Sequence, residues 1–178
     1  RLVGSEMCIR DRYEGFSRSV KAVMRQAEKG AMNGVHGPVS ALITTEKRFV
    51  TAIDTALGAS ASSIVVDSTS VGKQCISYLK RTDGGRATFL PLDTVQGSRF
   101  NGRLTGTAEV AADLVETAPQ YQHIIDNLLG RIIVVEDLGE ASVVAKNLGY
   151  RNRIVTMDGQ VINAGGSFTG GSTARSVR

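Results

Sequence analysis

Two stretches of the chain share one order of apolar and polar positions. "LITTEKRFVTAIDTALG" (42–58) and "LVETAPQYQHIIDNLLG" (114–130) lie at a constant offset of 72 residues. Leu, Thr, Ile, Asp, Leu and Gly recur at equivalent positions, and Phe49 corresponds to Tyr121. In both copies an aromatic residue, Ile and Leu stand at i, i+4 and i+8, which predicts a helix that ends at the final glycine.

The similarity continues beyond these helices after a loss of three residues. "IVVD" (64–67) corresponds to "IVVE" (133–136), and each predicts a β-branched strand. A second helical pattern follows in each copy, and then a short extended run, "RATFL" (86–90) or "RIVTM" (153–157). The chain is therefore predicted to hold two copies of a helix–strand–helix–strand unit, a mixed α/β (α+β) fold of two pseudo-repeated subdomains with small sheets.

One amphipathic helix is predicted ahead of the repeats. Its apolar residues recur at spacings of three and four, as in a helix or coiled coil, and "NGVHGP" (33–38) ends the pattern. Cations lie roughly opposite that stripe, as on a solvated helix face or a nucleic-acid-binding face. The apolar set is Tyr13, Phe16, Val20, Val23 and Ala27, and the cationic set is Arg18, Lys21, Arg25 and Lys29.

Composition narrows the class of protein. With 178 residues and 42% hydrophobic content, the chain can bury the core of one domain or of two small subdomains. Its longest aliphatic runs, such as "IIVV" (132–135), are far too short for a bilayer span, so no membrane segment is predicted. Two cysteines cannot form a disulfide framework, and Cys75 is predicted to be a buried, reduced thiol in a cytoplasmic protein.

The positive charge gathers near the two ends of the chain. Seven of the 21 Lys and Arg residues lie in residues 1–30, and no acid follows Gly159, whereas Arg175 and Arg178 do. Residues 1–12 show no hydrophobic period and are predicted to be a linker or a translation artefact.

Sequence motifs for catalysis are absent. "DSTSVGKQC" (67–75) lacks the first glycine and the hydroxyl residue of a Walker A loop, and "GGSFTGG" (165–171) lacks the last glycine of a nucleophile elbow. His36 and His123 are predicted to be structural, and the equivalence of Asp54 and Asp126 follows from the duplication. No enzyme activity, metal or cofactor is predicted.

The segment "NAGGSFTGGSTARS" (163–176) crowds four of the chain's 20 glycines into seven positions. Glycine permits a positive φ and lets another group approach the backbone closely. Two interpretations remain open on this pattern: a phosphate-binding nest in a small α/β anion- or nucleotide-binding domain, or a surface that another chain approaches.

Four phrases of the chain resemble the hinge domain of bacterial SMC (structural maintenance of chromosomes) proteins. They are "YEGFSRSVKAVM", "GVHGPVSALITTEKRFVTAIDTALG", "RATFLPLD" and "RIVTMDGQVINAGGSFTGGS". The resemblance implies the end of an entering coiled-coil arm at 13–30, hinge subdomains at 31–98 and 99–171, and the start of a returning arm at 172–178.

The resemblance also implies a function. In that family two hinges pair as a ring-like homodimer through sheet edges, and the glycine motif lies at the contact; here that motif is Gly165, Gly166, Gly170 and Gly171. The family's hinges bind DNA near the coiled-coil junction, which makes Arg18, Lys21, Arg25, Lys29, Arg175 and Arg178 candidates for weak, sequence-independent contacts.

The parent protein would act in chromosome condensation and segregation on the bacterial nucleoid. The resemblance places its ATPase heads outside this chain and implies kleisin-type subunits as partners of the parent protein.

Overall fold

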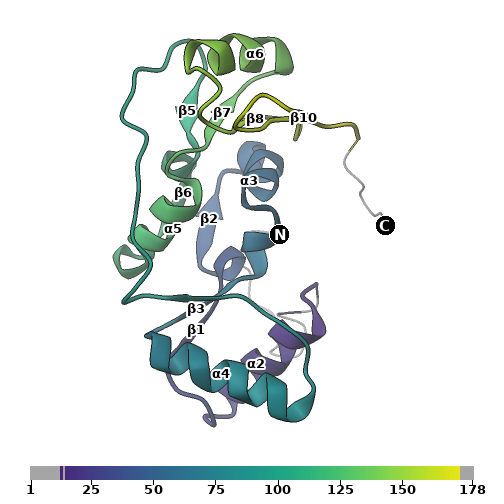
Figure 1. The fold of residues 1–178 in the computed structure, drawn as a ribbon, viewed down its shortest axis with the longest axis vertical. Helices are drawn as coiled ribbons and strands as arrows, with labels where there is room; N and C mark the ends of the chain where they lie inside the picture. Colours follow the sequence, from purple (N-terminus) through teal and green to yellow (C-terminus); the bar gives the residue numbers. More distant parts are fainter. Residues whose placement is uncertain (1–12, 14, 173–178) are drawn as a thin grey trace. The chain divides into compact units, whose positions relative to one another are not determined.

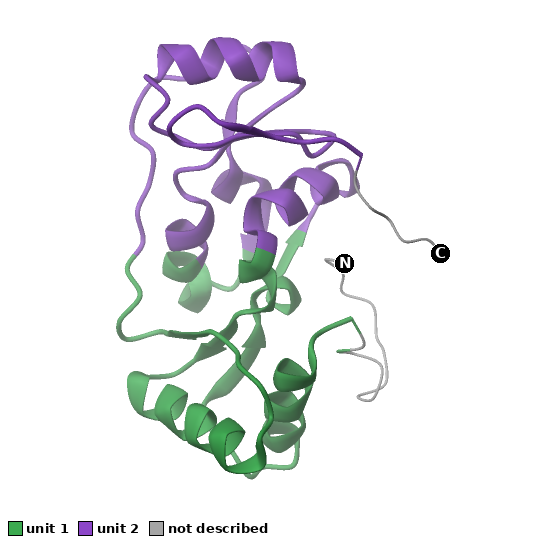
Figure 2. Ribbon diagram, turned by 45° about the vertical axis from the view of Figure 1, so that its right-hand side comes forward, with its two compact units in different colours: residues 1–44, 59–96, 117–124 green, residues 45–58, 97–116, 125–178 purple. Residues whose placement is uncertain are grey.

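The structure, a computed structural model, describes residue 13 and residues 15–172 as two compact units (Figures 1 and 2). Unit 1 combines the chain up to residue 44 with 59–96 and 117–124. Unit 2 combines 45–58 and 97–116 with the chain from 125 onward. Each unit therefore contains segments from both sequence repeats. The subdomain and arm boundaries expected at residues 31, 99 and 172 stay predictions.

Unit 1 is built on a three-stranded sheet in the order β1-β3-β4, in which β1 is antiparallel and β4 parallel to β3. Helix α4 provides the crossover between the parallel strands, and α2 packs beside α4 and β1. The elements are α2 (Arg18–Glu28), β1 (Val35–Pro38), β3 (Ile64–Val66), α4 (Thr69–Thr82) and β4 (Phe89–Pro91).

Unit 2 is built on a five-stranded sheet in the order β10-β9-β8-β7-β5, in which only the β7–β8 pair is parallel. Helices α3 and α6 both pack beside β8. The elements are α3 (Val50–Leu57), β5 (Glu109–Val110), β7 (Ile133–Val135), α6 (Leu138–Asn147), β8 (Ile154–Thr156), β9 (Val161–Ile162) and β10 (Phe168–Thr169).

The predicted helix–strand–helix–strand duplication is confirmed. α3, β3, α4 and β4 correspond to α5 (Gln122–Leu129), β7, α6 and β8, and the strand pairing is the same in both copies. A two-stranded sheet of β2 (Ile43–Thr45) and β6 (Val115–Thr117) completes the set. Thr45 Oγ1 donates to the Leu114 carbonyl and Thr117 Oγ1 to the Leu42 carbonyl, so donor and acceptor positions exchange between the copies.

The second helices of the two copies begin in the same way. Ser68 caps α4 by accepting a hydrogen bond from the Val71 N–H, and Asp137 caps α6 by accepting one from the Glu140 N–H. A side-chain oxygen at this position satisfies a backbone donor that the helix itself leaves unpaired. The caps lie 69 residues apart, as do β3 and β7, so the repeat extends to the helix start signals.

The two copies differ beyond their last common strand. In unit 2 the chain turns after β8 and adds β9 and then β10, whereas in unit 1 the sheet ends at β4. Pro91 at the end of β4 has no backbone N–H to offer to a further strand. The β9–β10 extension is therefore peculiar to unit 2 and contains the glycine-rich segment.

The core of unit 1 confirms the predicted apolar stripe. Val20 and Val23 on α2 are buried against the sheet and α4, and Tyr13, Phe16 and Ala27 pack against the same cluster. Cys75 on α4 is fully buried, as predicted, and its thiol donates to the Met32 sulfur over 3.2 Å. Burial favours the neutral thiol over the thiolate and raises the pKa of Cys75 to about 11.

The burial of Cys75 predicts that its thiol is alkylated slowly in the folded protein and that folding stability falls at high pH. In a Cys8→Ser background, alkylation at pH 8 should be at least roughly 100-fold slower in the folded protein than in urea, because the thiolate is scarce and covered. The folded state binds the thiol proton more tightly than the unfolded chain. The free energy that the buried Cys75 thiol contributes to folding is therefore fully present below pH 9. It is lost as the pH rises towards about 11. Equal alkylation rates in the two states would contradict the buried position.

Candidate interaction sites

The glycine-rich segment forms the hairpin between β9 and β10. The Asn163 N–H donates to the Ser167 carbonyl over 2.7 Å, and the Gly166 N–H closes the turn onto the Asn163 carbonyl over 2.9 Å. The Gly165 N–H donates to the Tyr150 carbonyl over 2.8 Å. Gly165 and Gly166 have φ values of 94° and 102°, which residues other than glycine rarely adopt. These two glycines are therefore required by the hairpin itself.

Gly170 and Gly171 have a different local reason. A Cβ on Gly170 would overlap the Gln160 side-chain oxygen, and Gly171 has a φ of 133°. The Gly171 N–H donates to that same oxygen over 2.8 Å. All four predicted interface glycines thus have an explanation within the chain, and their place at a contact between chains stays a prediction.

Strand β10 forms one edge of the unit 2 sheet. The Asn163 N–H donates to the Ser167 carbonyl, so these two residues form a hydrogen-bonded pair, and the register continues with Ile162 opposite Phe168. Antiparallel pairs alternate between bonded and non-bonded, so the Phe168 N–H and C=O point away from β9. The Phe168 side chain is 60% exposed. An unpaired backbone edge beside an exposed aromatic ring is a template for another strand.

Strand β4 forms an edge of the unit 1 sheet, which the sequence reasoning missed. The Thr88 carbonyl and the Leu92 N–H bond to β3, so the alternate residues Phe89 and Pro91 face outward. The Pro91 carbonyl already accepts from Thr94 and Val95. Phe89 therefore provides the outward N–H and C=O of this edge. In the second copy "RIVTM" is followed by the apolar residues of "VIN" (161–163), which form β9, whereas "RATFLPLD" in the first copy is followed by no such segment. This difference in the sequence could have revealed that β4 is an edge.

The hairpin has few features of a phosphate nest. The amides of Gly165, Gly166 and Gly171 donate to oxygens of the chain itself, and the segment leads into an edge strand rather than a helix. A nest presents such amides to an anion at the start of a helix. This geometry gives the anion-binding alternative no support.

The cationic face of α2 lies on the outside of unit 1, as expected. Arg25 and Lys29 are exposed, Lys21 is half-buried, and exposed Arg18 donates to the Asp83 carbonyl over 3.0 Å. Arg175 and Arg178 lie outside the described residues. The adjacent helix α4 adds cations that the sequence reasoning overlooked, although their helical spacing was readable: exposed Lys73, Lys80 and Arg81.

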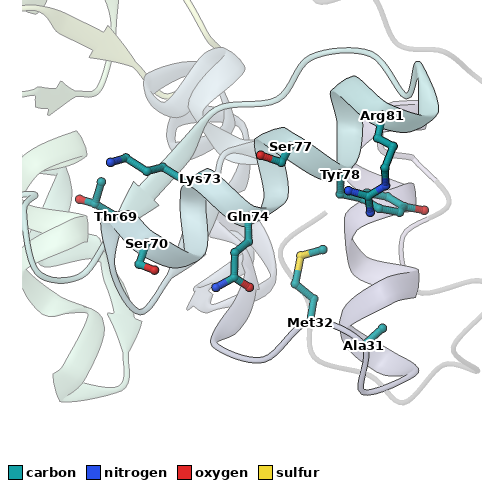
Figure 3. Close-up of a pocket in the computed structure, with 9 residues that line it drawn as sticks. All are labelled: Ala31, Met32, Thr69, Ser70, Lys73, Gln74, Ser77, Tyr78 and Arg81. Carbon is teal, nitrogen blue, oxygen red and sulfur yellow. The ribbon is translucent and has the colours of Figure 1, made fainter.

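A shallow depression of about 590 Å³ runs along α4 beside the turn that follows α2 (Figure 3). Thr69, Ser70 and Lys73 lie towards one end and Arg81 towards the other, with Gln74 and Ser77 between them. The Arg81 guanidinium lies over one face of the Tyr78 ring, with its Cζ atom 5.6 Å from the ring centroid. Apolar groups of Ala31 and Met32 line the depression together with polar and cationic side chains, and its lining residues include no nucleophile paired with a base.

The titratable residues singled out in the sequence make structural contacts. His36 bonds to Asp67 Oδ1 over 2.6 Å and to the Tyr121 hydroxyl over 2.7 Å, and His123 bonds to the Leu92 carbonyl over 2.9 Å. Asp126 accepts from Arg99 over 3.2 Å. No group of three or more potential metal ligands occurs within 13 and 15–172. In the same part of the chain, no helix is long and apolar enough to cross a membrane.

Comparison with known proteins identifies one family. Residues 32–145 match the family described as SMC proteins flexible hinge domain. The chromosome partition protein Smc of Bacillus subtilis (strain 168) is 42% identical over 170 residues, which cover 92% of this chain and 14% of that protein. The chain therefore spans a small part of the length of this relative.

Solved structures agree with this family. An asymmetric dimer of the Geobacillus stearothermophilus SMC hinge domain has a TM-score of 0.87 at 40% identity, covering 94% of this chain and 70% of that chain. The Pyrococcus furiosus Smc hinge domain with an extended coiled coil has a TM-score of 0.75 at 26% identity, covering 88% and 54%. The predicted mixed α/β fold and the resemblance stated from the sequence are confirmed.

Local backbone conformation predicts opposite effects for two glycine substitutions in unit 2, one in the β9–β10 hairpin and one on α6. Gly166→Ala should lower the free energy of unfolding by about 1–3 kcal/mol, because alanine must adopt a φ of 102°. Gly139→Ala on α6 should raise it by about 0.4–1 kcal/mol, because a Cβ there meets only Asp137 at 3.5 Å. Urea unfolding at a concentration where the protein is monomeric measures both. A neutral Gly166→Ala would contradict the strained turn.

Proposed function

This chain belongs to the family of SMC flexible hinge domains, and we propose that it is the dimerisation hinge of a bacterial chromosome-partitioning SMC protein. The outward edge of β10, with the exposed Phe168 ring beside it, is the observation that carries this proposal. The hinge would join two SMC chains on the nucleoid without catalysing a reaction itself. ATP turnover and kleisin-type partners would belong to the remainder of the longer protein.

We further propose how the two hinges pair. β10 of each chain would pair with β4 of the other chain. The same contact would therefore occur twice, which gives an isologous dimer. The pseudo-repeat supports this arrangement. β4 and β8 are equivalent strands, and β8 pairs with β9 on the side that in β4 is the sheet edge within the described residues. A strand from a second chain could take the equivalent place beside β4. The Phe168 and Phe89 backbones both point outward from their sheets, so each can complete the pairing of the other.

A proline at residue 168 tests the edge pairing. Phe168→Pro removes an N–H that points away from β9, so the hairpin is retained while the donor to the partner is lost at both symmetric contacts. Loss of two hydrogen bonds of about 0.5–1.5 kcal/mol each should raise the dimer dissociation constant roughly 5- to 150-fold. Sedimentation equilibrium measures the constant, and circular dichroism checks the fold.

Two further variants control this experiment. Phe168→Ala keeps the backbone donor and reports the ring separately, and Val143→Ala removes a similarly exposed apolar side chain from α6. Val143→Ala should dimerise as the unchanged protein does. A folded Phe168→Pro variant that dimerises with unchanged affinity would rule out β10 as the contact strand.

DNA binding is the second part of the proposed function. The exposed cations of α2, with those of the adjacent α4, would contact phosphates and give weak binding without sequence preference. Arg25 and Lys29 are the sharpest candidates, because both are exposed and lie near the C-terminal end of α2. Arg175 and Arg178 remain candidates from the sequence.

Matched charge removal tests the DNA contact. Arg25→Ala with Lys29→Ala and Lys47→Ala with Lys146→Ala each lower the formal net charge from +4 to +2, since two cations are lost. The α2 pair should weaken binding to a short random duplex and reduce its log–log salt slope by about 2, whereas the unit 2 pair should change the slope by less than about 1. Equal effects of the two pairs in fluorescence anisotropy would contradict a site on α2.

A further inference from the structure

The Gln160 side chain binds both backbone groups of Gly171. Its oxygen accepts from the Gly171 N–H over 2.8 Å, and its nitrogen donates to the Gly171 carbonyl over 2.9 Å. A primary amide presents the same donor and acceptor as a peptide group. The Gln160 side chain therefore bonds to Gly171 as a neighbouring strand would, two residues after β10 ends.

The backbone of Gln160 is itself fixed to the end of β8. Its N–H donates to Thr156 Oγ1 over 2.9 Å, and its carbonyl accepts from the Thr156 N–H over 2.9 Å. Thr156 is fully buried. The side chain that holds Gly171 thus extends from a turn whose last residue is hydrogen-bonded to the buried Thr156.

The two glycines beside the strand permit this contact. Gly170 has no Cβ to displace the Gln160 oxygen, and the positive φ of Gly171 directs its N–H and C=O towards the amide. β10 contributes only Phe168 and Thr169 to the pairing with β9. A strand of two residues has few ladder bonds of its own, so its ends decide whether it stays in register.

A second side-chain amide, that of Asn163, also bonds along β10. Asn163 Nδ2 donates over 3.1 Å to Ser167 Oγ, just before the strand on the turn side, and over 3.1 Å to Thr169 Oγ1, the last residue of the strand. The two amides differ in what they control. Asn163 fixes the hairpin turn, whereas Gln160 fixes the point at which the chain leaves the sheet.

We propose that Gln160 is the positioning residue that holds β10 ready to pair with a second hinge, and that it couples the path of the chain beyond Gly171 to the strength of the dimer. The inference rests on the proposed role of β10 in dimerisation. A chain drawn away after Gly171 breaks the two Gln160 bonds first and then loses the register of β10. Dimer affinity therefore depends on the direction in which the chain leaves the hinge.

Two substitutions test this coupling. Gln160→Ala removes both bonds and should raise the dimer dissociation constant about tenfold. Gln160→Glu keeps an acceptor for the Gly171 N–H but, as a carboxylate, cannot donate to the Gly171 carbonyl. Its affinity should fall near pH 7 and recover towards that of the unchanged protein near pH 4, where the carboxyl is protonated. Gln74→Ala, an exposed glutamine on α4, is the matched control and should have no effect.

A second readout separates this inference from the proposed function. Hydrogen exchange of the Gly171 amide, measured in the Phe168→Pro background where β10 cannot pair with a partner, reports the Gln160 bond within one chain. Exchange should accelerate at least tenfold in Gln160→Ala. Unchanged exchange would overturn the inference, as would normal dimerisation of Gln160→Ala when Phe168→Pro dissociates. If Gln160→Ala speeds exchange while neither variant weakens the dimer, the interface on β10 is wrong and the coupling falls with it.

Discussion

Each unit depends on one parallel pair of strands whose first member is buried on both faces. All three residues of β3, and all three of β7, are buried, and a helix crosses over to the parallel neighbour in each copy. Parallel strands require such a crossover and a cover of side chains, which explains why Ile and Val form continuous runs here. With the centre of each sheet fixed in this way, the edge is the part that remains variable.

The two sheets differ structurally at their edges. Unit 1 stops at β4, where a proline and a turn leave one residue with outward backbone groups. Unit 2 continues through β9 to a strand of two residues, along which the side-chain amides of Asn163 and Gln160 form hydrogen bonds. A duplicated fold thereby acquires two unlike edges, and unlike edges can complement each other in a pair of identical chains.

The sequence predicted the centre of the fold better than its edges. Ile53 and Ile125, equivalent residues of α3 and α5, are both buried, because helical and strand periods respond to burial that is local along the chain. The glycine cluster was visible, but its reasons were not: Gly170 depends on Gln160, a residue whose side chain reaches it only after the hairpin has formed. Likewise, β4 is an edge because no later strand within residues 15–172 pairs with its outer side, and no property of "RATFL" alone reveals this.

The interleaving of the units has a consequence for how the chain can be divided. The polypeptide passes from one unit to the other after residues 44, 58, 96, 116 and 124, so neither unit is a continuous stretch of chain. A single proteolytic cut in the glycine-rich stretch near Gly102 would leave each fragment holding elements that complete the other. Neither fragment would contain a complete unit, so both parts of the chain are needed to build either sheet with its surrounding elements.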